Sequence, residues 1–360
     1  MRILYLITGL GVGGAEKVVT ALADEMDARG HTVMVVYLTG PAIVKPDNRR
    51  IVIESLELES AKDLISSFVA LIKLVREFKP DVVHSHMIHA NILARLARPF
   101  CRVRRLVCTA HNSNEGGRAR MVAYRLTNSL ADVSTNVSAE AVKSFEDLGA
   151  VRPGEMQVVH NGICTDTYQY SEQDRKALRR EFSIDAGQTL ILAVGRLFEQ
   201  KDYPTLLCAL AYEPDALGDY HLVVAGDGPM RQQLTDLVQS LNLEGRVTFA
   251  GVRSDINRLM SAADIFVLSS AWEGFGLVVA EAMACERVVV ATNCGGVSEV
   301  LGDCGYLVPA KSSEKLSAAL KKVCALNEPD RGSIGKQARQ RIIDHYSLAA
   351  SADKWEALYQ

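Results

Sequence analysis

Two glutamates in the second half of the chain, Glu273 and Glu281, flank a glycine-bearing loop and stand eight residues apart. An apolar run precedes the loop and a helical pattern follows it, so Glu273 closes the strand side and Glu281 falls early in a helix. The free backbone N–H groups at such a helix start attract phosphate. Carboxylates instead accept hydrogen bonds from neutral hydroxyls. The pattern therefore predicts a site for a phosphate-bearing ligand, with Glu281 on a ribose diol and Glu273 on sugar hydroxyls.

Two cations, Arg196 and Lys201, follow another apolar run in the segment AVGRLFEQKDYPTLL. If that run is a strand, both cations lie at the strand end where open α/β sheets bind ligands. Two cations neutralise a diphosphate and stabilise it as a leaving group without a metal ion. Lone surface cations often serve only solubility, and the position of this pair favours phosphate binding.

Residues 9–14, GLGVGG, spell GxGxxG between an apolar run and a helical pattern. This is the dinucleotide-binding fingerprint, but a nicotinamide site also uses an acidic residue about 20 residues further on, after the second strand. Here the second apolar run ends at Thr39 without an acid. We predict a phosphate contact at Gly13 or Gly14, with a plain tight turn and a dehydrogenase site as alternatives. Glu16 is interpreted as an acid that offsets the helix dipole.

The first half contains a histidine group at His84, His86 and His89 and a further histidine, His111, beside Asn112. His84 and His86 share one face of an expected strand. Three imidazoles could bind zinc, but no cysteine or carboxylate nearby completes a ligand set. The three are therefore acceptor-side candidates, with a structural role as the alternative. A lone histidine such as His111 is more often structural.

The length of 360 residues exceeds the size of one hydrophobic core and predicts two domains of roughly 150 to 200 residues. Short apolar runs alternate with longer helical patterns, as in strand-helix-strand units with a parallel sheet. We therefore predict an α/β fold of two doubly wound, Rossmann-like domains. The first comprises residues 1–160 and a C-terminal helix at about 346–360 that packs back on it, and the second comprises residues 161–345.

The expected strands are residues 2–8, 31–38, 81–86, 105–110 and 132–138 in the first half and 189–195, 221–227, 246–251, 264–270, 287–293 and 306–309 in the second. Expected helices include residues 15–29 and about 63–78. In the last segment Leu348, Ala352, Trp355 and Tyr359 stand at helical spacing.

The composition is that of an ordinary globular protein with a net charge of -3. Eight cysteines without a CxxC pair are interpreted as buried small hydrophobic residues in a reducing compartment. No apolar stretch approaches the roughly 20 residues of a membrane helix, and the N-terminal run is interpreted as a strand rather than a signal peptide. We expect a cytoplasmic protein.

Basic residues are in excess between Lys73 and Arg125. A solvated face is one interpretation, and attraction to an anionic membrane or a pyrophosphate-linked lipid acceptor is the other. No recognised module supports nucleic-acid binding. The cations are Lys73, Arg76, Lys79, Arg95, Arg98, Arg102, Arg104, Arg105, Arg118, Arg120 and Arg125.

Several segments together resemble the family 4 retaining glycosyltransferases, which have the GT-B fold, over nearly the whole chain. They are EGFGLVVAE, the pair Gly195-Arg196 with Lys201, AGDGPMRQQL, VVHNGI and GVGGAE. The resemblance implies that Glu281 binds the ribose, Glu273 the donor sugar, and Arg196 and Lys201 the diphosphate. It implies further donor contacts at Gly195, Gly274, Phe275, Gly276 and Leu277, a nucleobase contact at Val252 and Arg253, and a sugar contact at His111, with Asn112 a weaker candidate.

The resemblance also implies transfer of a hexose or N-acetylhexosamine from a nucleotide-diphosphate sugar, UDP before GDP, with retention of configuration. No DxD sequence occurs, which agrees with a metal-independent enzyme without another cofactor. In a front-face mechanism the departing phosphate oxygen takes the acceptor proton, so we name His111, Glu273, Arg196 and Lys201 as stabilisers rather than a base.

The expected acceptor is a glycan or polyprenyl-diphosphate-linked glycan of the cell surface, used at the inner face of the membrane. Domain closure is expected to assemble the site. An NAD(P)-dependent oxidoreductase and a non-catalytic sugar-nucleotide-binding protein are the alternatives.

Overall fold

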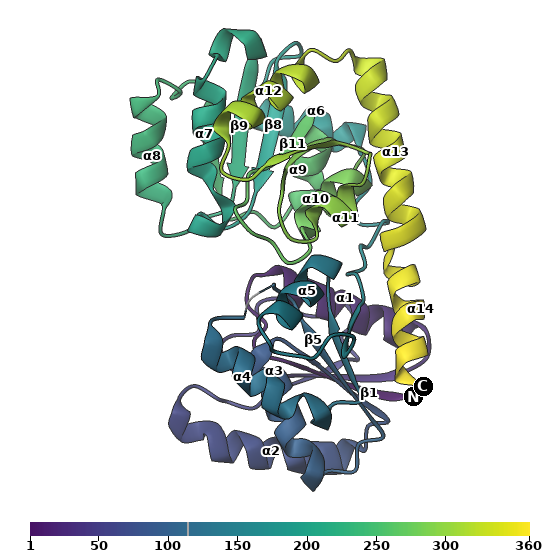
Figure 1. Cartoon of the computed structure of the whole chain (residues 1–360). Coiled ribbons are helices and arrows are strands. Elements are labelled where there is room, and N and C mark those ends of the chain that lie inside the picture. The colour runs from purple at the N-terminus through teal and green to yellow at the C-terminus, as the bar shows by residue number, and fades with distance from the viewer. Residues whose placement is uncertain (114) are drawn as a thin grey trace. The chain divides into compact units, whose positions relative to one another are not determined.

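A computed structural model of the chain describes residues 1–113 and 115–360, and for residues 214 and 215 it describes the backbone alone. The chain divides into two compact units (Figure 1). Unit 1 comprises Met1–Gly162 and Leu348–Gln360, and unit 2 comprises Ile163–Ser347. The boundaries expected from the sequence follow residues 160 and 345.

Within its described residues, unit 1 contains a seven-stranded parallel sheet in the order β3-β2-β1-β4-β5-β6-β7. Its strands are β1 (Arg2–Ile7), β2 (Thr32–Tyr37), β3 (Val52–Ser55), β4 (Val82–His86), β5 (Arg105–Ala110), β6 (Val133–Asn136) and β7 (Met156–Val158). Its helices are α1 (Gly14–Ala28), α2 (Leu64–Phe78), α3 (Ile88–Ala97), α4 (Arg118–Thr127), α5 (Ala139–Asp147) and α14 (Leu348–Tyr359), with short 3-10 turns at Ala61–Asp63, Arg98–Phe100 and Asn128–Leu130. Because β1 pairs with both β2 and β4, the winding of the sheet reverses between β1 and β4.

Unit 2 repeats this architecture with a parallel sheet of six described strands in the order β10-β9-β8-β11-β12-β13. The strands are β8 (Thr189–Val194), β9 (Tyr220–Ala225), β10 (Val247–Gly251), β11 (Ile265–Leu268), β12 (Val288–Asn293) and β13 (Tyr306–Pro309). The helices are α6 (Glu172–Glu181), α7 (Tyr203–Ala211), α8 (Arg231–Ser240), α9 (Ile256–Ala262), α10 (Leu277–Ala284), α11 (Val297–Leu301), α12 (Ser313–Cys324) and α13 (Glu328–Tyr346), with 3-10 turns at Glu199–Lys201 and Pro214–Leu217. Here the winding reverses between β8 and β11. The predicted α/β architecture of two doubly wound sheets is confirmed.

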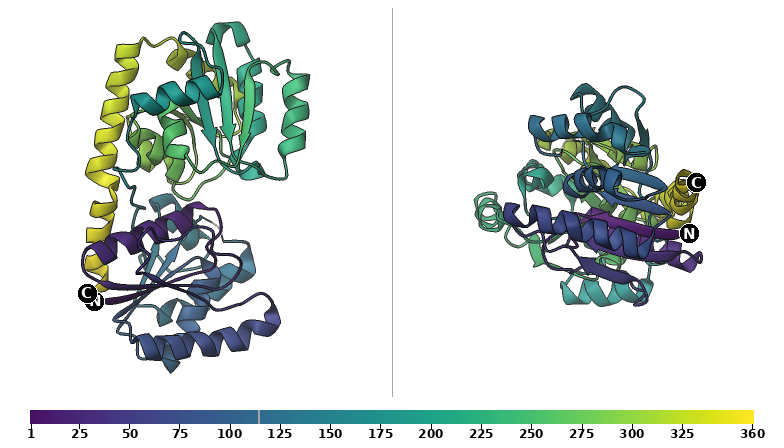
Figure 2. Two further views of the ribbon diagram at one scale, coloured as in Figure 1. Left: turned by 180° about the vertical axis from the view of Figure 1, so that it is seen from behind. Right: turned by 90° about the horizontal axis from the view of Figure 1, so that it is seen from below.

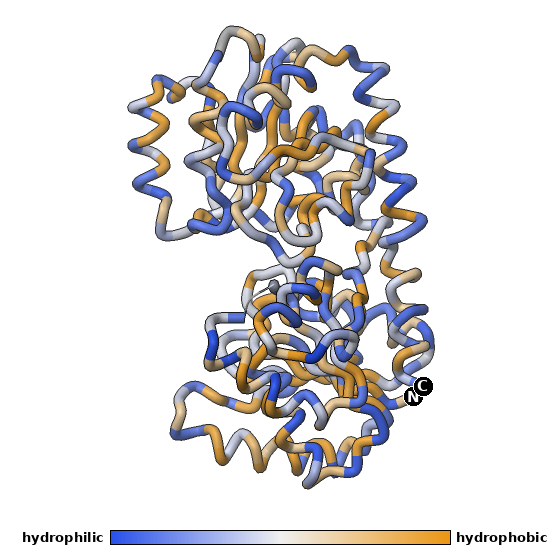
Figure 3. Tube along the Cα trace, in the orientation of Figure 1, coloured by the Kyte–Doolittle hydropathy of each residue, from blue (hydrophilic) through white to orange (hydrophobic). Residues whose placement is uncertain are grey.

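The strands are apolar on both faces because helices cover both faces of each parallel sheet. In β1, for example, every residue from Ile3 to Ile7 is buried, without the alternation of a half-exposed strand. Figure 3 shows the same contrast along the chain, with apolar strands inside each unit and mixed polarity along the outer helices. This continuity made the central strands recognisable in the sequence.

The last helix, α14, packs into unit 1, as its apolar spacing predicted. Trp355 and Tyr359 join the core cluster that contains Tyr5, and the hydroxyl oxygens of Tyr5 and Tyr359 are 3.1 Å apart. The two chain ends consequently lie side by side in all views (Figure 1, Figure 2).

Some details differ from the sequence prediction. Strands β3 and β7 were not predicted, because they are short edge strands of mostly exposed residues that lack a continuous apolar run. All eight cysteines are free thiols; Cys108, Cys285 and Cys294 are buried as expected, and the other five are only half-buried. Among the helices described here, none is long and apolar enough to cross a membrane.

Candidate active site

Three of the predicted ligand-binding residues of unit 2 lie at the reversal of its sheet. Arg196 follows the carboxyl end of β8, and Glu273 follows that of the neighbouring strand β11. Open α/β sheets bind ligands beyond the carboxyl ends of the strands at such a reversal, because the connections there lead away in opposite directions. The fold thus brings Arg196, Lys201 and Glu273 to one edge of the sheet.

Glycines allow the loops after β8 and β9 to pack against each other. A Cβ at Gly226 would lie 2.0 Å from the carbonyl oxygen of Gly195, and one at Gly228 would lie 2.5 Å from another carbonyl oxygen of the same segment. The Gly195 carbonyl also accepts a hydrogen bond of 3.0 Å from the Tyr203 hydroxyl. These contacts fix the backbone beside Arg196, whose exposed side chain has no polar partner among the described residues.

Glu273 is buried among polar neighbours. Its Oε1 lies 2.6 Å from Nζ of Lys201 and accepts a hydrogen bond of 2.7 Å from the Ser270 hydroxyl. The sequence prediction assigned Glu273 to sugar hydroxyls and Lys201 to the diphosphate, whereas the structure pairs the two charges. Both side chains are largely withdrawn from water, where opposite charges at this distance attract strongly. A donor phosphate would therefore share the Lys201 ammonium with this carboxylate.

The loop after β12 fixes the backbone of the Glu273 segment, a contribution that the sequence interpretation missed. A Cβ at Gly295 would lie only 1.9 Å from the Glu273 carbonyl oxygen, and Gly295 has a φ of +55°. The N–H of Gly296 donates a hydrogen bond of 3.1 Å to the carbonyl of Gly274. The sequence feature that could have indicated this contact is the NCGG run at residues 293–296, because it directly follows an apolar strand.

Gly276 caps the start of helix α10, and its φ and ψ of 84° and 46° lie in the left-handed region. The Val279 N–H donates to the Gly276 carbonyl at 2.8 Å, whereas the N–H groups of Leu277 and Val278 have no acceptor inside the helix, which suits a phosphate. Phe275 is buried, with its ring centroid 5.8 Å from that of Tyr346. Its side chain belongs to the core, so a ligand contact at this position falls to the backbone, as predicted for this segment.

Glu281, in the second turn of α10, is only 2% exposed. Its Oε1 accepts a hydrogen bond of 2.8 Å from the Tyr168 hydroxyl. Burial and the neighbouring Glu281 carboxylate raise the pKa of Tyr168, so its hydroxyl stays protonated as a donor. Tyr168 is thus a neighbour of the predicted ribose contact that no sequence motif indicated.

The two predicted nucleobase contacts, Val252 and Arg253, differ in exposure and in the partners that they already have. Val252 is 72% exposed. The Arg253 guanidinium, in contrast, lies 2.6 Å from Glu181 and 2.7 Å from Asp255, and these hydrogen bonds raise its pKa. The two ion pairs engage most of the N–H groups of Arg253, an arrangement that the residue type alone could not reveal.

The glycine loop of unit 1 lies beyond the carboxyl end of β1, next to the reversal between β1 and β4. Gly13 precedes the first turn of α1 in an extended conformation. A Cβ there would lie 2.3 Å from a carboxylate oxygen of Glu16, so Glu16 folds back over the helix start. This position suits the predicted interaction with the helix dipole. A phosphate at Gly13 would displace that carboxylate.

His84 lies in the core of unit 1 and has no exposed surface. Its Nδ1 is 2.7 Å from the Tyr359 hydroxyl, and its Nε2 is 2.7 Å from the Thr109 hydroxyl. Its ring centroid is 4.5 Å from that of Trp355. Both nitrogens are satisfied inside the protein, which corrects the prediction that His84 faces an acceptor. His89 is exposed at the start of α3.

His86 is likewise buried, at 1% exposure, so it too is removed from the acceptor-facing candidates. His111 follows β5 and is half-buried, and the adjacent Asn112 is exposed. Burial lowers the pKa of His111 to about 4, so its ring is neutral at pH 7. Glu115, which no sequence motif indicated, accepts a hydrogen bond of 3.2 Å from the backbone N–H of His111, and burial raises its pKa to about 7.

The basic patch is smaller than the sequence suggested. Arg95 is completely buried and donates hydrogen bonds to Thr127, Asn128 and Ser134. Arg98 pairs with Asp132, and Arg105 donates to the carbonyl of Leu358. The exposed members of the group are Lys73, Arg76, Lys79, Arg102, Arg104, Arg118, Arg120 and Arg125.

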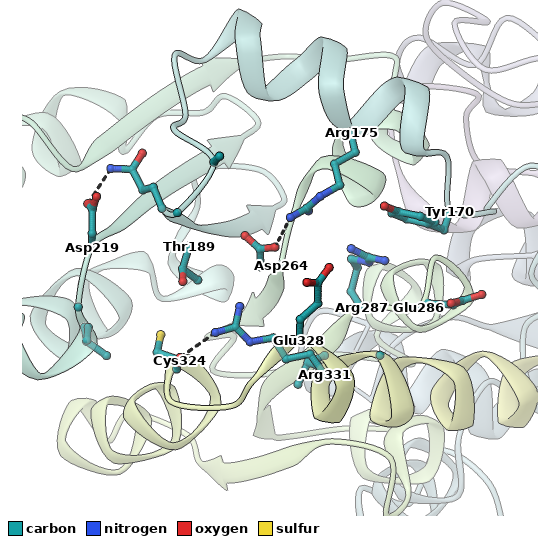
Figure 4. A pocket seen from close by; sticks show the side chains of 17 residues that line it. Tyr170, Arg175, Thr189, Asp219, Asp264, Glu286, Arg287, Cys324, Glu328 and Arg331 are labelled. Atoms are coloured by element: carbon teal, nitrogen blue, oxygen red, sulfur yellow. Dashed lines mark hydrogen bonds and ion pairs between the residues drawn. The ribbon is translucent and has the colours of Figure 1, made fainter.

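A cavity of about 570 Å³ lies at the other edge of the unit 2 sheet (Figure 4). Its lining includes Thr189 and Val288, the first residues of β8 and β12. Asp264, also in the lining, pairs with Arg175 at 2.6 Å. The cavity is therefore at the amino ends of the strands and forms no part of the candidate site.

Known proteins resemble both halves of the chain. The family model "Glycosyltransferase Family 4" matches residues 12–167, and the model "Glycosyl transferases group 1" matches residues 174–341. The crystal structure of Anabaena HepE in complex with UDP and glucose has a TM-score of 0.87 at 24% identity, over 99% of this chain and 98% of that chain. This likeness shows the fold.

Two similar relatives are bacterial glycosyltransferases. The UDP-Gal:alpha-D-GlcNAc-diphosphoundecaprenol alpha-1,3-galactosyltransferase of Escherichia coli is 25% identical over 83% of this chain and 79% of its own. The N-acetylgalactosamine-N,N'-diacetylbacillosaminyl-diphospho-undecaprenol 4-alpha-N-acetylgalactosaminyltransferase of Campylobacter jejuni is 26% identical over 97% of both chains.

The two parallel, doubly wound sheets and the likeness to Anabaena HepE identify the GT-B fold, and the two family models identify a glycosyltransferase. The chain belongs to glycosyltransferase family 4. The resemblance found in the sequence is confirmed, and the dehydrogenase interpretation of the glycine loop is dropped because the family match extends through that half of the chain.

Replacement of Gly295 by alanine is expected to weaken nucleotide-sugar binding by about tenfold or more, because the new Cβ would push the Glu273 backbone out of place. Isothermal titration measures the effect. Gly245→Ala is the control, since a Cβ there meets no atom within 4 Å. Equal affinities of Gly295→Ala and the unaltered protein would contradict the positioning role of Gly295.

Glu115→Gln tests the raised pKa of this carboxyl. Between the ordinary pKa of 4.5 and the native pKa of about 7, the native state binds more protons than the unfolded state. The contribution of Glu115 to stability therefore falls as pH rises through this window. Between pH 4.5 and 8 the unfolding free energy of Glu115→Gln should gain on the order of 3 kcal/mol relative to the unaltered protein. Urea unfolding measures this difference, and a constant difference would refute the raised pKa.

Proposed function

We propose that the protein transfers a hexose or N-acetylhexosamine from a nucleotide-diphosphate sugar, UDP-linked rather than GDP-linked, to a glycan or lipid-linked glycan acceptor. The anomeric configuration is retained, and neither a metal nor another cofactor takes part. The observation that carries this proposal is the contact of Lys201 with Glu273 at the reversal of the unit 2 sheet. In this proposal the Lys201 ammonium serves the phosphate, and the adjacent Glu273 carboxylate serves the hydroxyls.

The donor lies along the start of α10 in this proposal. Its diphosphate meets the first-turn N–H groups and the exposed Arg196, and its ribose diol meets Glu281 beside Tyr168. Glu273 accepts from hydroxyls of the transferred sugar. A uridine nucleotide is supported by the UDP-Gal donor of the Escherichia coli relative and by the UDP in the Anabaena complex.

Transfer breaks the bond between the anomeric carbon and the diphosphate oxygen and forms one to the acceptor oxygen on the same face of the sugar. The acceptor proton passes to the departing phosphate oxygen, and Arg196 and Lys201 stabilise the negative charge that remains. His111 contacts the donor sugar near the reacting carbon. The exposed His89 and Asn112 are the remaining acceptor-side candidates.

Glu281→Ala and Glu273→Gln should lose affinity for different parts of the donor. Glu281→Ala is expected to bind both UDP and the UDP-sugar about tenfold more weakly, because ribose contacts are common to both ligands. Glu273→Gln should bind UDP normally and the UDP-sugar more weakly. Isothermal titration against a panel of UDP- and GDP-sugars measures these differences, with Glu244→Ala, an exposed glutamate of the same unit, as the control. Failure of every nucleotide sugar to bind would overturn the proposal.

A lipid-linked acceptor implies contact with a membrane surface, which we propose for the exposed side of α2. The names of the Escherichia coli and Campylobacter jejuni relatives both specify a diphospho-undecaprenol-linked acceptor. On α2 the apolar side chains of Ile65 and Val69 are 78% and 57% exposed, and Phe100, 56% exposed, stands edge-on to Phe68. Lys73, one turn after Val69, adds an exposed cation. An apolar surface flanked by cations suits anionic lipid at the inner face of a membrane.

Sedimentation with anionic vesicles at low salt should carry the protein down, and neutral vesicles should leave most of it in solution. Ile65→Glu should reduce the bound fraction severalfold, because it places a negative charge on the apolar surface. The control is Ile43→Glu, since Ile43 is 60% exposed in another part of unit 1. Complete retention of the unaltered protein in the supernatant would contradict membrane contact.

A further inference from the structure

Three histidines of unit 1 form a continuous row that ends at a predicted sugar contact. The ring centroids of His84 and His86 are 4.0 Å apart, and those of His86 and His111 are 5.3 Å apart. Nδ1 of His86 lies 3.0 Å from Nε2 of His111, within hydrogen-bonding distance. The row therefore connects the core of unit 1 to His111 after β5.

Some ring nitrogens of this row have a hydrogen-bond partner in the protein and others do not. His84 uses both nitrogens inside the protein, on Tyr359 and Thr109. His86 uses Nδ1 on His111, whereas its Nε2 is buried and has no partner among the described residues. His111 is half-buried, and its Nδ1 has no polar partner in the described part of the chain. One nitrogen of His111 thus remains for a ligand.

The unpartnered Nε2 of His86 decides which ring donates the shared hydrogen. Burial lowers the pKa of both His86 and His111, so both rings are neutral at pH 7 and each carries one N–H. If His111 donated, the N–H of His86 would sit on the buried Nε2 without an acceptor. A buried N–H without a partner is rarer in proteins than a buried acceptor without one. His86 therefore carries its hydrogen on Nδ1 and donates it to Nε2 of His111.

We propose that His86 is a positioning residue that fixes the tautomer of His111. With Nε2 accepting from His86, the hydrogen of His111 must be on Nδ1, where it faces the ligand as a donor. The inference rests on the proposed function, in which His111 contacts the donor sugar. It specifies the chemistry of that contact, namely an N–H that donates to a sugar hydroxyl or phosphate oxygen.

The backbone around His86 supports a fixed orientation. The next residue, Met87, has a φ of +71°, a strained value for a residue with a side chain, and its N–H donates to the Thr109 carbonyl at 3.0 Å. Tyr5 packs against His86 with a ring-centroid distance of 5.9 Å. His86 is thus held between β1, His84 and the bend that begins α3.

Long-range proton–nitrogen correlation spectra of the full chain, labelled with 15N at histidine, test the tautomer in the absence of any ligand. We expect His111 to show a protonated Nδ1 in the unaltered protein. His86→Asn places an amide nitrogen near the position of Nδ1 and should preserve this tautomer. His86→Gln places its amide near the position of Nε2, and His111 should revert to the Nε2-protonated form that histidine prefers in water. Thermal unfolding verifies that both variants fold.

Turnover of the nucleotide sugar should be high in the variants in which His111 is protonated on Nδ1 and low in the variant in which it is not. His86→Gln is expected to lower kcat about tenfold, because the donor N–H near the reacting carbon is lost, while His86→Asn stays within about threefold. His345→Asn, an exposed histidine in unit 2, is the control. An Nε2-protonated His111 in the unaltered protein, or equal turnover of His86→Asn and His86→Gln, would overturn the inference. Lack of turnover by the unaltered protein would refute the proposed function and leave the tautomer assignment intact.

Discussion

The reversal of winding in each parallel sheet is the constraint on which the candidate site depends. Between β8 and β11, and again between β1 and β4, neighbouring strands send their connections in opposite directions. The carboxyl ends of these strands consequently lack a covering crossover. Arg196 and Glu273 follow two of these ends, and the glycine loop and His86 belong to the other two. Residues far apart in the sequence thereby become neighbours within each unit.

Close backbone packing gives these strand ends their shape. The carbonyl of Gly195 meets Gly226, and the carbonyl of Glu273 meets Gly295, at separations that leave no room for a Cβ. The position of Glu273 is therefore set by the loop after β12, which packs against its backbone. Its charge is balanced locally, because Lys201 and Ser270 both reach the same carboxylate oxygen. A ligand that binds here enters an existing polar network.

The sequence was sufficient to predict the central strands and the strand ends at which the candidate site lies. Continuous apolar runs marked β1 and β8, and the short exposed strands β3 and β7 had no such run. Glycine-bearing turns after those runs marked the strand ends. Residue type could not reveal which polar groups face inward, because that depends on partners distant in the chain.

His84 and Arg95 illustrate this limit. His84 is satisfied by Tyr359 from the far end of the chain, and Arg95 by residues more than thirty positions away. From the sequence His84 was an acceptor-side candidate, with a structural role as the alternative, and Arg95 was counted in the basic patch; both are buried. The pairing of Lys201 with Glu273 was likewise invisible, since it joins two loops separated by 72 residues.

The C-terminal helix α14 has a consequence for how the chain acquires its structure during synthesis. Unit 1 begins with Met1 and includes Gln360, so the whole of unit 2 is made before unit 1 has all its parts. Tyr359, which meets both Tyr5 and His84, follows unit 2 in the chain. The ribosome must therefore synthesise all of unit 2 before this core can close. The half that is translated first completes its fold only after the other half has been made, and the buried His84 lacks its Tyr359 partner until then.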